Sequence, residues 1–422
     1  MYKILNIFIF FFIFCFSLSA QELQSKGNID LSSQFYLKKP TQKHPNNFTA
    51  SANLEFTYNT DILELKTKLY AQGDYYDTKT TQEKNKRSFV RLDEFYLLYE
   101  MENNQIKVGK NIEFWGALEV RNITDTFNPT DLRSDPFNLQ KLGVWNATFT
   151  HYTENGELSF IVKAYEQGLE SPANPYVYYY FPQKINNIAL TYNNNLHTQK
   201  SNTRPTCYIK YAASTDTDYP LDFAIILQNG YDSQRYYKIQ TANNFANMSI
   251  QQNAYIVNKI MTYNTLVVDS TLYKFEASYA NVQKSKENNV SDYIHLGLGV
   301  EHTLTQVYKE ANLGFIGEYY YYDTFDKDKK TDLELFETFQ NDLFLGLRYS
   351  FNEGNDASII GGAILDFDYN EQVYYVQYES RIANLLKLNL DYRYIKPSQN
   401  TLTAFNLMGT HERLSIKLGY YF

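Results

Sequence analysis

Apolar and polar residues alternate with a period of two along most of the chain, and the segment from 410 to 422 shows the pattern most clearly. One set of alternate positions there is apolar, and the set between them is charged or small. The apolar set is Leu414, Ile416, Leu418, Tyr420 and Phe422, and the other set includes Arg413, Ser415, Lys417 and Gly419. This period predicts a β-strand with one apolar face and one polar face.

The same alternation recurs from residue 27 to the end of the chain, and turn-forming stretches such as Asn59-Thr60-Asp61 separate the alternating segments. We therefore predict an all-β chain built from about eighteen strands, with sixteen as an open alternative. The predicted strands are 27–37, 49–58, 62–73, 88–101, 105–112, 143–153, 157–166, 205–214, 221–229, 255–268, 270–281, 291–302, 309–322, 339–351, 357–368, 373–381, 385–395 and 410–422.

The connections between these strands are alternately short and long. An antiparallel up-and-down barrel in a membrane has an even number of strands, short turns on the periplasmic side and longer loops outside. The short connections, among them 102–104 and 154–156, all fall on one side under this scheme. A further candidate strand, 185–193, would make the number odd, so we assign it to an outer loop.

Charge distinguishes the two faces of each strand. A Lys or Arg on the lipid face near the middle of a bilayer costs about 2–4 kcal/mol, so the apolar face points outward and the charged face lines the interior. The inward charges either create a transverse field across the pore or pair with one another on neighbouring strands. The pore-lining residues predicted in this way are Arg348, Lys387, Asp391, Arg393, Arg413 and Lys417.

Composition supports a membrane barrel over a soluble protein. The chain has 40 Tyr and 29 Phe residues but only 2 Trp, and aromatic rings with a polar tip favour the boundary between membrane and water. No Gly/Ser-rich or Pro-rich linker divides the chain into domains. The net charge of -8 gives no basic patch for nucleic acid. Alternation begins by Ile29, which leaves no room for a plug domain before the barrel.

The first twenty residues have the features of a signal peptide. Lys3 precedes an apolar run from Ile4 to Phe16, and Ser17-Leu18-Ser19-Ala20 offers small residues for cleavage. We expect residues 1–20 to be removed and residues 21–422 to form the barrel after export through the periplasm. The predicted location is the bacterial outer membrane, with its lipid around the barrel.

The last strand resembles the final strand of bacterial outer-membrane barrels, which alternates in the same way and ends on a C-terminal Phe. The resemblance implies recognition by the barrel-assembly machinery. The residues that would carry this assembly signal are Leu418, Tyr420 and Phe422.

The segment from Glu113 to Leu142 differs from the rest because it is dense in charged and turn-forming residues. It either folds into the barrel and narrows the pore, or remains a surface loop. Its FWG followed by FNPTDLR is similar to a loop in a porin-like family of proteobacterial barrels, over about thirty residues. The residues that would form a charged constriction are Arg121, Asp125, Asp131, Arg133 and Asp135.

Nothing in the sequence indicates catalysis, a metal or a cofactor. None of the six histidines lies in a recognisable motif, and the acidic loop around Asp323 lacks the glycine of an EF-hand. Cys207 has no cysteine partner in the mature chain. The chain is therefore not expected to be an enzyme.

Strand number decides which functions remain, because 16 to 18 strands enclose a water-filled channel. The leading interpretation is a porin for passive diffusion of small hydrophilic solutes. The oligomeric state stays open, and a homotrimer is one possibility. The alternatives are a transporter of apolar or amphipathic compounds, and a structural or adhesion barrel whose loops carry the function.

Overall fold

The computed structural model describes residues 23–38, 47–78, 86–135, 137–172, 176–177, 181, 184–185, 187–241, 248–284, 290–325, 337–399, 401 and 403–422. The predicted signal peptide, residues 1–20, lies outside these ranges. Among the described helices, none is both long and apolar enough to cross a membrane.

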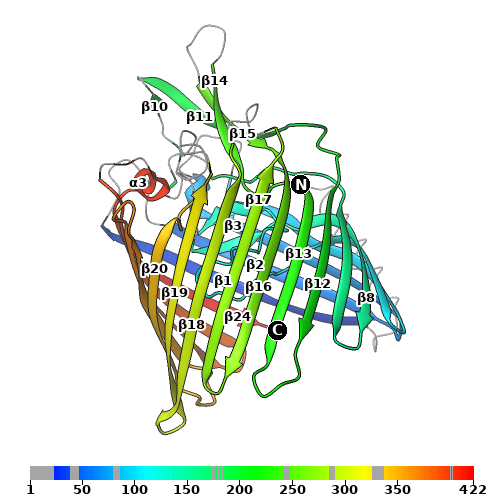
Figure 1. Ribbon diagram of the computed structural model, residues 1–422. Helices are drawn as coiled ribbons and strands as arrows, with labels where there is room; N and C mark the ends of the chain where they lie inside the picture. Colours follow the sequence, from blue (N-terminus) through cyan, green and yellow to red (C-terminus); the bar gives the residue numbers. More distant parts are fainter. Residues whose placement is uncertain are drawn as a thin grey trace.

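Eighteen strands form one closed antiparallel barrel, which confirms the predicted fold (Figure 1). Each barrel strand pairs with the next one along the chain, and β1 pairs with β24 to close the ring. The barrel strands are β1 (Leu23–Lys38), β2 (Asn47–Asn59), β3 (Leu63–Asp74), β4 (Phe89–Met101), β5 (Asn104–Asn111), β8 (Val144–Thr153), β9 (Gly156–Lys163), β12 (Thr206–Ser214), β13 (Leu221–Tyr231), β16 (Ile256–Val268), β17 (Thr271–Val282), β18 (Tyr293–Tyr308), β19 (Ala311–Thr324), β20 (Asn341–Ser350), β21 (Ser358–Asp366), β22 (Gln372–Ala383), β23 (Leu386–Lys396) and β24 (His411–Tyr421).

Each of these strands overlaps one of the eighteen predicted strands, so the count of eighteen is correct and that of sixteen is not. The ends differ by a few residues; β18, for example, continues to Tyr308, beyond the predicted end at 302. The seam is held at the end of the chain by two backbone hydrogen bonds. Gly27 N donates to Phe422 O over 2.8 Å, and Phe422 N donates to Gly27 O over 3.0 Å.

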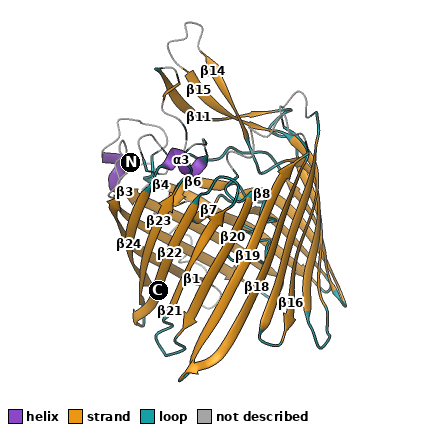
Figure 2. Ribbon diagram, turned by 60° about the vertical axis from the view of Figure 1, so that its left-hand side comes forward, coloured by secondary structure: helices purple, strands orange, loops and turns teal. Residues whose placement is uncertain are grey.

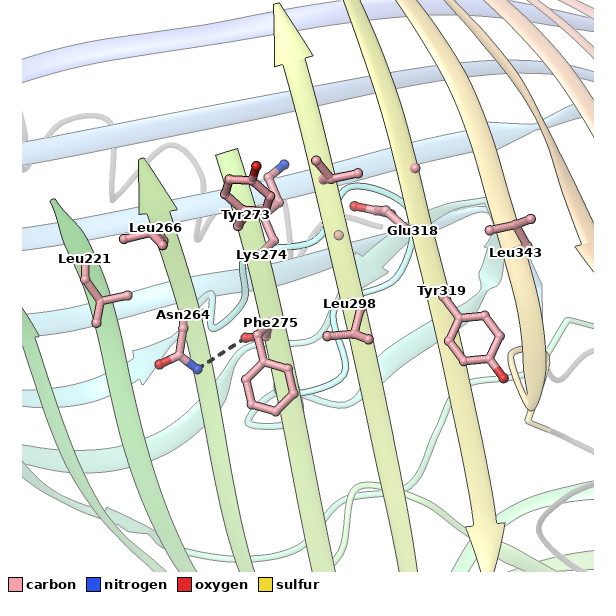
Figure 3. Close-up of a pocket in the computed structure, with 13 residues that line it drawn as sticks. Leu221, Asn264, Leu266, Tyr273, Lys274, Phe275, Leu298, Glu318, Tyr319 and Leu343 are labelled. Carbon is pink, nitrogen blue, oxygen red and sulfur yellow. Dashed lines mark hydrogen bonds between the residues drawn. The ribbon is translucent and has the colours of Figure 1, made fainter. Parts of the chain in front are cut away.

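The outer wall is apolar, as the alternation predicts. Leu298 is 54% exposed and Leu345 is 52% exposed, whereas their inward neighbours His295 and Phe344 are buried. A pocket of about 690 Å³ lies on this wall, and the outward side chains of Tyr273 and Leu298 are among the residues that line it (Figure 3). Apolar surface of this kind is stable only when lipid or protein covers it.

A second sheet lies beyond one end of the barrel (Figure 2). It consists of β10 (Lys184–Ile185), β11 (Ile188–Thr198), β15 (Met248–Ala254) and β14 (Tyr236–Thr241), with β11 and β15 parallel. The segment 185–193 is therefore outside the barrel, as predicted, but it is largely strand and not merely loop. The sequence analysis did not identify β14 and β15.

Candidate channel constriction

The segment between β5 and β8 runs through the inside of the barrel and carries a short hairpin, β6 (Thr130–Asp135) and β7 (Asn138–Lys141) (Figure 2). We call residues 112–143 the inserted loop. Its two ends are tied together by Asn128, whose side-chain Nδ2 donates to the carbonyls of Asn111 and Leu142, each over 3.0 Å. The loop therefore forms a folded unit.

Two buried carboxylates of the barrel wall hold the backbone of the inserted loop. Glu276 of β17, which is 0% exposed, accepts hydrogen bonds from Ala117 N at 2.6 Å, Leu118 N at 3.0 Å, and both the N at 3.0 Å and the Oγ1 at 3.1 Å of Thr124. Glu276 forms no ion pair with a described residue. The N–H groups of the inserted loop thus provide hydrogen bonds to the buried carboxylate of Glu276.

Glu318 of β19 holds the next residues of the loop. Its carboxylate accepts from Glu119 N at 2.7 Å, Val120 N at 3.0 Å and the hydroxyl of Tyr320 at 2.6 Å. The Tyr320 oxygen in turn accepts from Arg121 N over 3.1 Å. Residues 117–121 therefore follow the wall formed by β17 and β19.

Ion pairs hold the returning part of the loop to other strands. Asp131 is fully buried and pairs with Arg91 of β4 and, over 2.8 Å, with Arg133. Asp135 pairs with Arg413 of β24. Burial by itself raises the pKa of Asp135, but Arg413 and Arg393 outweigh this and hold the pKa below its ordinary value.

The six predicted pore-lining residues are mostly paired. Arg348 bridges Glu301 of β18 and Glu119 of the inserted loop, each over 2.7 Å. Asp391 pairs with Arg413 on β24 and, over 2.9 Å, with Arg393 on its own strand. The two lysines differ: Lys387 pairs with Glu379 over 3.0 Å, whereas Lys417 has no ion pair with a described residue.

An open cavity of about 500 Å³ separates the inserted loop from the wall of β21 to β23. A second cavity, of about 230 Å³, continues from it. The two share lining residues, so they adjoin there, and we call this shared boundary the neck. The residues common to both are Arg121, Asn122, Asp125, Asn128, Thr130 and Leu139 of the loop, Thr338, and Met408 of the helix α3 (Ala404–Met408).

The predicted constriction residues fall into two groups around this neck. Arg121 and Asp125 line it, whereas Asp131, Arg133 and Asp135 line neither cavity and contact the barrel wall. Of the predicted pore-lining residues, only Arg393 lines the larger cavity. The sequence analysis did not identify the anchors Glu276 and Glu318 or the helix α3.

Asp125 is the titratable carboxylate of the neck. It pairs with Lys141 and accepts from Trp115 N over 3.3 Å, yet burial outweighs both contacts and raises the pKa of the carboxyl above its ordinary value. Asp125 therefore takes up a proton at a higher pH than a solvated aspartate does.

Lowering the pH from neutral to about 4 is expected to make the neck more selective for anions, because a protonated Asp125 no longer offsets Lys141 and Arg121. Reversal potentials in a salt gradient measure this shift. In Asp125→Asn the selectivity at neutral pH should already resemble that of the wild type at low pH. An equally large pH shift in that variant would assign the titration to another group.

Within the described ranges, no group of three or more His, Cys, Asp or Glu side chains is arranged to hold a metal ion. The terminal residues that resemble an assembly signal lie at the seam between β24 and β1. Leu418, Tyr420 and Phe422 all point outward and are 37%, 43% and 49% exposed.

Comparison with known proteins agrees with the barrel fold. No family model matches the sequence, and no curated protein matches it. Among solved structures, OccAB3 of Acinetobacter baumannii aligns with a TM-score of 0.56 at 10% identity, covering 95% of this chain and 98% of that one. OccD3 (OpdP) of Pseudomonas aeruginosa aligns with a TM-score of 0.52 at 9% identity, covering 95% and 91%.

OccK5 (OpdH) of Pseudomonas aeruginosa also aligns with a TM-score of 0.52, at 8% identity, over 95% of this chain and 97% of that one. At these identities the likeness concerns the fold alone. The chain has the fold of a bacterial outer-membrane β-barrel.

Proposed function

We propose that this chain is an outer-membrane channel through which small solutes diffuse passively. The observation that carries the proposal is a pair of adjoining cavities beside the inserted loop, the larger of which lies between the loop and the wall of β21 to β23. An eighteen-stranded barrel is too wide for side chains alone to fill, so a loop that occupies part of the lumen leaves a path beside it.

The inserted loop is the constriction in this proposal, and Arg121 and Asp125 are its charged residues. Arg121 Nη2 lies 3.8 Å from a carboxylate oxygen of Glu337, which is a loose contact, and the side chain is 36% exposed. Asp125 is more tightly paired, with Lys141. Of the two, Arg121 is thus the charge of the neck that has the weaker ion pair.

The remaining parts of the proposal concern how the protein reaches the membrane and assembles there. Cleavage after residue 20 and export through the periplasm would precede folding. The C-terminal residues Leu418, Tyr420 and Phe422 would bind the barrel-assembly machinery. A homotrimer is the proposed assembly, and chemical crosslinking in native outer membranes tests it.

Single-channel recording in a planar bilayer, with reversal potentials in a salt gradient, tests the channel. Steady conductance steps are expected. Arg121→Gln is expected to shift the reversal potential toward cations by removing one positive charge at the neck. Lys417→Gln is the matched control, because it removes one lumen charge that does not line either cavity and should shift the potential less.

A protein shown to be folded that produces no conductance steps would contradict the channel. Steps with equal shifts for Arg121→Gln and Lys417→Gln would leave the channel standing but would place its constriction away from Arg121.

A further inference from the structure

The wall opposite the inserted loop departs from the polar interior expected of a water-filled pore. On β21 the lumen-facing positions include Ile360 and Ile364, and on β22 they include Tyr375. All three line the larger cavity. Apolar residues are therefore found on both faces of β21, since its outward positions are also apolar.

Aromatic rings pack closely in this part of the wall. The ring of Phe344 stacks on that of Tyr375, with centroids 5.9 Å apart and planes 11° apart. The Phe344 ring also lies over Gly346 and Gly362, where an added Cβ would come within 2.4 Å of its atoms. Neither glycine could be replaced without displacing the ring, so no side chain interrupts the apolar surface there.

The apolar surface continues from the barrel wall toward the outer end of the passage. Phe339 precedes β20, and Phe405 and Met408 belong to α3. All three line the larger cavity but are less than 8% exposed, so only a small part of each side chain reaches it. The Phe405 ring stacks on Phe137 of the loop, with centroids 5.9 Å apart. We call this surface the apolar track, and its residues are Phe339, Ile360, Ile364, Tyr375, Phe405 and Met408.

The inserted loop presents mainly polar groups to the same cavity. Its polar lining residues are Glu119, Arg121, Asn122, Asp125, Asn128, Thr130 and Lys141, and its apolar ones are Phe114, Val120, Phe137 and Leu139. The buried Nε of Arg121 has no hydrogen-bond partner among the described residues. The facing wall is mainly apolar, with Gln377 and Arg393 as its polar lining residues. The passage therefore has one mainly apolar and one mainly polar side, and a solute in it can contact both at once.

We infer that the solutes of this channel are amphipathic organic molecules. The aromatic or branched aliphatic part of such a molecule contacts the apolar track, and its polar group contacts the inserted loop. This inference rests on the proposed channel and specifies its small solutes as molecules with one apolar part, in place of the hydrophilic solutes expected from the sequence. Pockets for such ligands combine apolar walls with a few polar groups in this way.

Two amino acids of similar size and identical head group, L-phenylalanine and L-glutamine, isolate the contribution of the solute's body. Each is added to a conducting channel in a planar bilayer, and the concentration that half-blocks the current is measured. Phenylalanine is expected to block at a concentration about fivefold lower than glutamine, because only its ring removes apolar surface from water on the track.

Substitutions in the track separate its chemistry from its shape. Ile360→Thr and Phe405→Ser are expected to abolish most of the preference for phenylalanine, and the conservative variants Ile360→Val and Phe405→Leu should keep most of it. Ile360 is partly exposed to the lumen and Phe405 lies outside the barrel strands, so the barrel should fold in all four variants.

Calorimetric binding of the two amino acids to the purified protein in detergent provides a readout that does not depend on conduction. Equal block and equal binding by phenylalanine and glutamine, or a preference unchanged in Ile360→Thr and Phe405→Ser, would overturn the inference. A protein that shows no conductance but binds phenylalanine through these residues would contradict the proposed diffusion. The apolar track would then be a binding surface and not part of a channel.

Discussion

Replacing both Glu276 and Glu318 by alanine is expected to raise the single-channel conductance at least about twofold, because conductance follows the open cross-section of the pore. The two carboxylates accept six hydrogen bonds from residues 117–124 of the inserted loop, five from backbone N–H groups and one from the Thr124 hydroxyl. A hydrogen bond to a charged group contributes about 1.5–3 kcal/mol. Without these acceptors the loop loses its attachment to β17 and β19.

Fluorescence of Trp115 reports the same event independently of conduction. The indole is 1% exposed and packs against Phe127 and Tyr208, with ring centroids 5.1 Å and 5.5 Å away. The other tryptophan, Trp145, faces outward and is replaced by Phe in the background used for the measurement. Release of the loop should shift the Trp115 emission to longer wavelength.

Glu157→Ala is the matched control for the two anchors. Glu157 also faces the lumen and pairs with Lys210 over 3.0 Å, but it makes no contact with the inserted loop. Its removal should leave both conductance and Trp115 emission close to those of the wild type. If the anchor variant folds and still conducts like the wild type, the loop is held mainly by its ion pairs with Arg91 and Arg413.

The number and order of the barrel strands could be predicted from the sequence because lipid imposes a period of two on every spanning segment. Outward positions such as Leu298 and Leu345 must be apolar regardless of what lies inside. The parity rule then excluded 185–193 from the barrel, which the separate sheet confirms. Where no lipid acts, as in β14 and β15, each strand has only a short apolar alternation, Tyr237 and Ile239 on one and Met248 and Ile250 on the other, and this was too short to identify them.

The candidate site was predictable only in part, for a physical reason. An inward glutamate such as Glu276 is typical of any water-filled lumen, and its role depends on a loop that is more than 150 residues away in sequence. The charges of the inserted loop were visible, but burial decides which of them pair with the wall. Asp135 could equally have faced the pore until the structure placed it against Arg413.

The apolar track did leave a signal in the sequence. The segment 359–365 reads IIGGAIL, a longer apolar run than those of other strands such as β13, where residues 223–227 read FAIIL. A run of this kind indicates a strand with two apolar faces. In a barrel wall, the second apolar face can only point into the lumen.

Asp391→Ala is expected to lower the free energy of unfolding by about 3 kcal/mol or more, since breaking a buried ion pair leaves an uncompensated charge. Asp391 pairs with both Arg393 and Arg413, and Arg413 is 1% exposed. Arg413 also pairs with Asp135 of the inserted loop, so a disturbed Arg413 should also loosen the loop. Urea unfolding in detergent micelles, followed by the change in electrophoretic mobility between folded and unfolded barrel, measures the loss.

Glu379→Ala provides the comparison that tests whether burial is the cause. Glu379 is likewise the acidic partner of a lumen-facing cation, Lys387, but their side chains are 36% and 25% exposed. An ion pair that water reaches contributes about 0–1 kcal/mol, so this variant should unfold at nearly the same urea concentration as the wild type. If Asp391→Ala and Glu379→Ala lower the free energy of unfolding by the same small amount, water also screens the ion pairs of Arg413. The charges on β23 and β24 would then belong to an open lumen and would not fix the position of the inserted loop.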